Sequence, residues 1–167
     1  MKKELSLSVL EYNTLIKDVE AFCKKFWKRE GYPFYDDLRI PSDMKDEYQN
    51  TVGKYSNFIF NELYKEFWKE GFKVNSEYEV LPEWYYAPEI PWGSIFWRMG
   101  SGETYNTILY QTYLATLTQT QREEWETKYP EPCFYDEEYL SSHYDEILKD
   151  FEKKNPKLYK ELTEPGK

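Results

Sequence analysis

The strongest constraint on the fold comes from residues 8–30, where apolar residues recur at intervals of three and one. This spacing places them along one face of an α-helix. Ser8 and Glu11 have the spacing of a capping box, and Gly31 can end the helix. We therefore predict a helix over residues 8–30. Its buried face comprises Tyr12, Leu15, Ile16, Val19, Phe22, Cys23, Phe26 and Trp27.

A second helix is predicted over residues 42–70, after a connector that contains two prolines. Ser42 or Asp43 can cap its start, and Gly71 can end it. Gly53 lies within this helix, where glycine costs about 1 kcal/mol relative to alanine. We therefore expect a bend or a close helix contact at Gly53. The apolar stripe comprises Met44, Tyr48, Val52, Tyr55, Ile59, Leu63 and Phe67.

Most of the remaining chain is also predicted to be helical. Residues 105–117 have apolar positions that suit a helix and many Thr and Tyr residues that suit a strand, and we favour the helix. Thr120 and Glu123 have capping-box spacing for a short helix. Ser142 can cap another helix, and Pro156 is typical of the first turn of a final one.

Residues 72–99 differ from the rest, because short alternating segments replace the helical spacing. Residues 72–74 and 78–80 alternate around Asn75-Ser76-Glu77, which predicts a small β-hairpin. Residues 94–99 are a candidate for another strand. The expected fold class is α+β and mainly α, with about five or six helices and a small β-hairpin or sheet element around residues 72–99. At this length, we expect residues 1–167 to form one domain.

The segment 82–93 combines three prolines with four aromatic residues and is the first candidate for recognition. Trp84, Tyr85, Tyr86 and Trp92 can provide a large contact area, and proline stiffens the loop before binding. Such rings can anchor a protein partner or stack on a nucleotide. Alternatively, they pack inward and cover the helices.

The second candidate is a concentration of acidic residues. The net charge is −9, from 31 acidic and 22 basic residues, which disfavours binding to duplex nucleic acid or to an anionic membrane. Carboxylates on a rigid helix can instead substitute for phosphates in the basic groove of another protein. The alternative is a solvated helix face. The candidate partner-binding residues are Glu123, Glu124, Glu126, Asp136, Glu137 and Glu138.

No motif indicates catalysis, and we predict no enzyme, no metal site and no cofactor. Cys23 and Cys133 form no C-x-x-C pair, and His143 is the only histidine. Glycine-rich phosphate loops are absent from the sequence. A cysteine–histidine pair of Cys133 and His143 is conceivable but unspecific, and sequence alone cannot place two carboxylates across a substrate.

These features together predict a small acidic binding protein. In type, it resembles the anti-CRISPR and anti-restriction inhibitors of phages and mobile elements, which implies a basic nuclease or nucleoprotein as partner. One alternative is an aromatic pocket for a nucleotide-like small molecule, and another is a homo-oligomeric structural protein. No secretory signal or transmembrane segment is seen, so we expect a cytoplasmic location.

Overall fold

The computed structural model forms two compact units, residues 1–130 and 131–167, and each is considered by itself. Throughout the described residues the chain is helical where it is regular, and it contains no strand. The single domain predicted from the sequence stays a prediction. The structure describes residues 5–33, 37–63, 65, 77–91, 93–132, 141–154 and 156–163.

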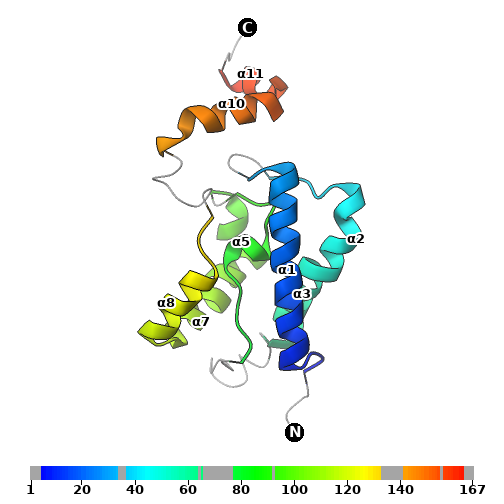
Figure 1. Ribbon diagram of the computed structural model, residues 1–167, viewed down its shortest axis with the longest axis vertical. Helices are drawn as coiled ribbons and strands as arrows, with labels where there is room; N and C mark the ends of the chain where they lie inside the picture. Colours follow the sequence, from blue (N-terminus) through cyan, green and yellow to red (C-terminus); the bar gives the residue numbers. More distant parts are fainter. Residues whose placement is uncertain are drawn as a thin grey trace. The chain divides into compact units, whose positions relative to one another are not determined.

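The first predicted helix is confirmed as α1 (Val9–Glu30), the long helix of the first unit (Figure 1). Ser8 Oγ accepts a hydrogen bond from the Glu11 amide at 3.2 Å, and the Glu11 carboxylate accepts one from the Ser8 amide at 2.8 Å. Gly31 ends the helix with a φ of +83°, which favours glycine because it has no Cβ. All eight residues of the predicted face are buried.

The second predicted helix is confirmed as far as Leu63, but it is not one regular α-helix. Residues 66–70 of the prediction, and the expected end at Gly71, lie outside the described residues. Wider π-helical turns alternate with α-helical ones, and Gly53 ends the first of them. A Cβ at Gly53 would lie 2.7 Å from Gln49 Oε1, which is the end of a flexible side chain in the same helix. Its segments are η1 (Ser42–Met44), α2 (Lys45–Tyr48), η2 (Gln49–Gly53), α3 (Lys54–Phe58) and η3 (Ile59–Leu63).

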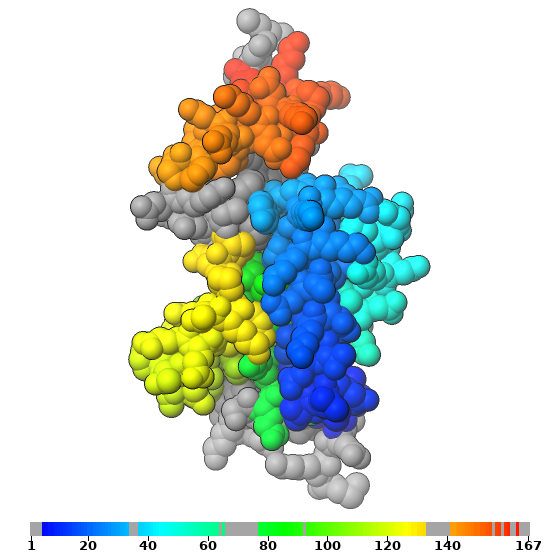
Figure 2. Space-filling model, in the orientation of Figure 1, coloured from blue at the N-terminus to red at the C-terminus, as the bar shows by residue number. Residues whose placement is uncertain are grey.

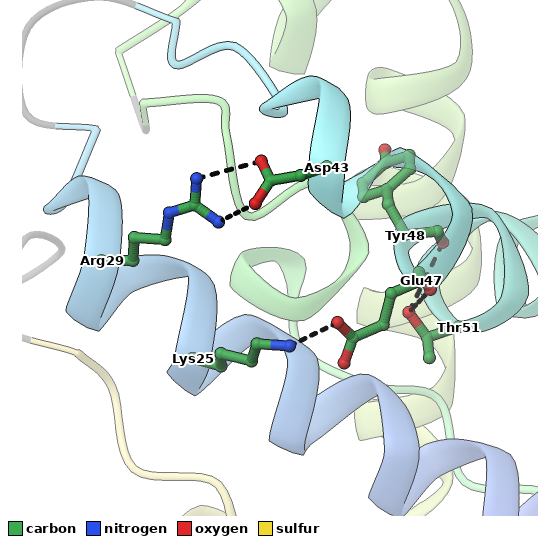
Figure 3. Close-up of polar contacts among 6 residues, drawn as sticks. All are labelled: Lys25, Arg29, Asp43, Glu47, Tyr48 and Thr51. Atoms are coloured by element: carbon green, nitrogen blue, oxygen red, sulfur yellow. Dashed lines mark hydrogen bonds and ion pairs between the residues drawn. The ribbon is translucent and has the colours of Figure 1, made fainter.

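Two exposed ion pairs link the start of this helix to α1, and the side-chain cap expected from Ser42 or Asp43 is not formed. The residue before it is a proline, and no side chain caps it. Asp43 instead forms a two-point contact with Arg29, with an Nη1–Oδ2 distance of 2.6 Å (Figure 3). Lys25 Nζ lies 2.6 Å from a carboxylate oxygen of Glu47. Both pairs join α1 to the second helix.

The predicted hairpin is wrong for the described residues 77–80, which form no ladder; residues 72–76 lie outside the described part. The backbone of this segment bonds to tyrosine hydroxyls instead. The Leu81 amide donates to Tyr55 Oη at 2.9 Å, and the Leu81 carbonyl accepts from Tyr105. Tyr12 donates to the Glu79 carbonyl. Buried backbone groups need partners, and these hydroxyls supply them without a second strand.

The strand predicted over residues 94–99 is wrong as well. Residues 95–98 form a 3-10 turn, η4 (Ile95–Arg98), because Ser94 Oγ accepts from the Phe96 amide at 3.2 Å and caps it. Trp97 Nε1 donates to the Pro91 carbonyl at 3.0 Å and holds the turn against the proline segment. The fold class is therefore helical in the described residues, without the β element that the sequence predicted.

The helix favoured over residues 105–117 is confirmed, but the capping box that follows lies two residues earlier than predicted. Thr118 Oγ1 accepts from the Gln121 amide at 3.3 Å, and Gln121 Oε1 accepts from the Thr118 amide at 2.9 Å. Thr120 and Glu123 are therefore inside the helix. These elements are α6 (Gly100–Glu103), η5 (Thr104–Tyr110), α7 (Gln111–Thr116) and α8 (Gln119–Lys128).

Aromatic rings connect these elements into the core of the first unit. Tyr86, from the short helix α5 (Glu83–Tyr86), stacks on Tyr105 with centroids 4.0 Å apart and ring planes within 3°. The neighbouring Tyr85 of α5 contacts Trp27 of α1 and Tyr129, with ring centroids 5.6 Å and 6.0 Å apart. The core therefore depends on ring packing more than on aliphatic side chains.

The described residues of the second unit include the helices α10 (Tyr144–Lys154) and α11 (Pro156–Thr163). The helix that Ser142 was expected to cap is present as α10, which begins at Tyr144, and the helix expected to begin at Pro156 is present as α11. The rings of Phe151 and Tyr159 are 6.4 Å apart, so the two helices contact each other. Charges of both signs alternate along α10, and Asp150 pairs with Lys154 at 2.7 Å.

Candidate functional site

One side of the helix α8 packs against the rest of the first unit. Trp125 is buried and contacts both Tyr110 and Tyr129 at ring-centroid distances of 5.5 Å. Glu79 adds a polar attachment at the end of the helix, because its Oε2 accepts from Lys128 Nζ and from Tyr129 Oη, each at 2.8 Å. These contacts and the capping box fix the helix in one orientation.

The opposite side of α8 carries Glu123, Glu124 and Glu126, which we call the α8 acidic face. All three residues are exposed, and α8 is at the surface of the first unit (Figure 2). With 3.6 residues per turn, the three side chains span an arc of about 160° on the side away from Trp125. These carboxylates were expected on a rigid helical surface, and α8 brings the three together on one exposed face.

Basic residues lie at both margins of the α8 acidic face. Arg122 Nε lies 3.3 Å from Glu126, an exposed pair that contributes little to stability. Lys128 is engaged by Glu79. Glu123 accepts a hydrogen bond from Gln119 Nε2 at 2.7 Å, and within the described part of the chain no ion pair involves Glu123 or Glu124. The two carboxylates therefore keep their charge unpaired.

The structure describes three of the six acidic residues that were predicted to bind a partner. Asp136, Glu137 and Glu138 lie outside the described residues. Three further acidic residues of the acid-rich region, Asp145, Glu146 and Asp150, belong to α10 in the second unit and are exposed. The candidate site is therefore restricted to the three carboxylates of α8.

The aromatic candidates of the proline segment face the core. Trp84, Tyr85 and Tyr86 are only 8%, 3% and 6% exposed, while Trp92 lies outside the described residues. These three rings therefore pack inward, which was the alternative considered from the sequence. Their role as anchors for a partner or a nucleotide stays a prediction, but in this conformation their surfaces are covered by neighbouring residues.

Sequence reasoning missed two carboxylates of the first unit, Glu79 and Glu89. Burial, together with the negative charge of Glu79, raises the pKa of Tyr129 well above its usual range. Glu89 accepts a hydrogen bond from Tyr48 Oη at 3.0 Å, and burial raises the pKa of its carboxyl. No sequence signal marks either residue, because neither belongs to an acidic run or a recognisable motif.

Cys23 is the one described cysteine, and its surroundings make it inert. It is fully buried on α1, as its place in the apolar stripe predicted, and burial raises the pKa of its thiol well above the usual value. Thiols react as thiolates, so this shift opposes nucleophilic chemistry. Cys133 lies outside the described residues, and the pair that it was considered to form with His143 cannot be placed.

Two further properties concern only the described residues. No cluster of three or more His, Cys, Asp or Glu side chains there has the geometry to hold a metal ion. None of the described helices has the length and apolar character needed to cross a membrane.

Comparison of the chain with models of protein families, with curated proteins and with solved structures gave no match.

Proposed function

We propose that this protein binds a basic partner through the α8 acidic face and acts by that contact. The observation that carries the proposal is the anchoring of α8 on one side and the exposure of Glu123, Glu124 and Glu126 on the other. A fixed helix presents its charges without the ordering cost of a flexible segment. Unpaired carboxylates on such a helix attract Lys and Arg side chains and accelerate association.

The most specific form of the proposal is an inhibitor made by a phage or mobile element. Its partner would be a nuclease complex of the anti-CRISPR or anti-restriction target class, whose basic groove normally holds nucleic-acid phosphates. Phosphates along a nucleic acid and carboxylates along a helix both present negative charge in a row. Occupation of the groove would therefore exclude the nucleic acid, with a strong dependence on salt.

The test is a cleavage assay with purified nuclease complexes, namely a CRISPR effector and a restriction endonuclease, each with its own DNA substrate. We compare the unaltered protein with the triple variant Glu123→Lys, Glu124→Lys and Glu126→Lys. We expect the unaltered protein to inhibit one of these enzymes at low salt and to inhibit it less as salt increases. The triple variant should lose this inhibition while it keeps its helical circular dichroism.

A matched control separates a local contact from net charge. The triple variant Asp18→Lys, Asp46→Lys and Glu103→Lys changes exposed acids on α1, α2 and α6, and like the α8 variant it raises the net charge from −9 to about −3. Inhibition should survive in this control. Equal effects of the two triple variants would contradict a contact at α8. Failure of the unaltered protein to inhibit any enzyme would contradict the nuclease form of the proposal.

A further inference from the structure

Glu89 is a carboxyl group with too few partners for an ionised state. Tyr48 Oη donates to its Oε1 at 3.0 Å. Its Oε2 is shielded from solvent, and no described group donates a hydrogen bond to it. An ionised carboxylate has several acceptor positions and requires donors or cations to offset its loss of hydration. The site therefore suits the neutral, protonated acid better than the anion.

The segment that carries Glu89 joins three other parts of the first unit. The Glu89 carbonyl accepts a hydrogen bond from the Leu38 amide at 2.7 Å and so holds the connector between α1 and η1. The neighbouring Pro88 carbonyl accepts from Trp27 Nε1 of α1 at 2.9 Å. The Glu89 side chain reaches Tyr48 of α2. One short segment thus secures the connector, α1 and α2.

Among the described residues, the titratable groups that interact with Glu89 carry no positive charge. The titratable side chains that interact with it are Cys23 from α1, Tyr48 from α2, Tyr86 from α5 and Asp37 from the connector. Burial is the main cause of the raised pKa of Glu89, and the negative charge of Asp37 adds to it. Ionisation of Glu89 therefore creates a negative charge that repels Asp37. Asp37 belongs to the connector that the Glu89 carbonyl holds through Leu38.

We propose that Glu89 is the proton-sensitive group of a latch that holds residues 37–41 against α1, α2 and residues 87–91. With the carboxyl protonated, the latch is closed and the Leu38–Glu89 hydrogen bond is kept. When the carboxyl ionises, the buried charge and its repulsion with Asp37 favour an open form in which residues 37–41 separate from residues 87–91. The partner-binding role proposed for α8 is independent of this latch.

The direction of the pH dependence follows from proton linkage. In the closed form the pKa of Glu89 is raised by burial. In an open form the pKa returns to the ordinary value of 4.5. Below that pH both forms are protonated and the stabilisation is complete. As pH rises toward the pKa of Glu89 in the closed form, the ratio of open to closed molecules increases by about tenfold per pH unit. Above that pKa there is no further loss.

Amide hydrogen exchange of the unaltered protein tests the latch. Across pH 4–8, measured by NMR, we expect the protection factor of the Leu38 amide to fall by about tenfold per pH unit within the linkage range. The Tyr129 amide, which donates to the Trp125 carbonyl at 2.9 Å at the end of α8, serves as the reference. Its protection factor should change much less. Equal slopes at the two amides would overturn the latch.

A second measurement removes the titrating group. Glu89→Gln keeps an oxygen that can accept from Tyr48 but has no charge, so Leu38 protection in this variant should be independent of pH. Its melting temperature should match that of the unaltered protein at pH 4 and exceed it at pH 8. Glu124→Gln, at an exposed position, should not alter the slope. A Glu89→Gln protein with the unaltered slope would overturn the proposal, and the exchange data decide the question if this variant does not fold.

Discussion

Residues 82–93 and a set of acidic residues that includes those of α8 were the two contact regions predicted from the sequence. Their described parts differ in environment, because residues 82–88 are buried and the α8 acidic face is exposed. The aromatic rings of α5 pack into the core, whereas the carboxylates of α8 face solvent. Both regions are rigid, yet for different reasons. Residues 82–91 are held by ring packing, and α8 is held by Trp125, Tyr129 and its capping box.

The difference shows how the environment decides the role of a residue type. An aromatic ring gains free energy wherever it leaves water, and the interior of its own chain is the nearest place to do so. A carboxylate loses free energy when it leaves water without partners, so Glu123 and Glu124 remain outside. In this chain a high aromatic content therefore did not predict an exposed surface, because Trp84, Tyr85 and Tyr86 are buried.

The largest expected change in unfolding free energy is at the buried rings of α5. Tyr86→Ala removes a ring that stacks on Tyr105 at 4.0 Å and should reduce the free energy of unfolding by about 3–5 kcal/mol. Chemical denaturation followed by circular dichroism measures it. Glu124→Ala, on the exposed helix, is the control. A loss below about 1 kcal/mol for Tyr86→Ala would contradict the assignment of this ring to the core.

A smaller effect is expected where a hydroxyl replaces a strand partner. Tyr55→Phe keeps the ring but leaves the buried Leu81 amide without its acceptor, which should cost about 1–3 kcal/mol in unfolding free energy. Tyr144→Phe removes a hydroxyl from a side chain that is 54% exposed and should change the value by less than about 0.5 kcal/mol. Similar results for the two variants would show that the Leu81 amide has another partner.

The capping box of α8 can be tested by a pair of matched substitutions. Thr118→Ala removes the observed cap and should lower the unfolding free energy by about 1 kcal/mol. Thr120→Ala changes an exposed position inside the helix and should raise the value by a few tenths, since alanine favours helix. Thermal denaturation of both variants distinguishes the two. The reverse order would restore the cap that the sequence predicted.

The smallest effect is expected at the exposed end. Glu124→Lys should change the free energy of unfolding by less than about 0.5 kcal/mol, because Glu124 has no ion pair among the described residues. Thermal denaturation at low and high salt measures this value. A loss above 1 kcal/mol that disappears with salt would reveal an attraction that stabilises the fold.

The sequence predicted the elements whose partners lie nearby in the chain. The face of α1 could be read completely, because the eight apolar residues at helical spacing are all buried, and Ser8 and Glu11 cap the helix locally. The cap of α8 was misplaced by two residues, because Thr118 and Thr120 are both capping residues with a suitable side chain three residues later. Spacing alone cannot choose between them.

The parts that could not be predicted depend on contacts between distant residues. The alternation around residue 77 was typical of a hairpin, but three tyrosines from α1, α3 and η5 satisfy the backbone there. No local pattern encodes that arrangement. At the candidate site, the exposure of Glu123, Glu124 and Glu126 agrees with their helical pattern. Glu89 could not be identified, because its importance comes from burial beside Tyr48 and not from its neighbours in sequence.

The three tyrosine hydroxyls around residues 79–81 also bear on self-association. An extended segment outside a sheet usually offers a row of open amides and carbonyls, to which another extended chain can add and start aggregation. Here Tyr55 and Tyr105 occupy both backbone groups of Leu81, and Tyr12 occupies the Glu79 carbonyl. Leu81 is itself fully buried. The most strand-like stretch among the described residues therefore presents no template at Leu81 on which a second molecule could extend a sheet.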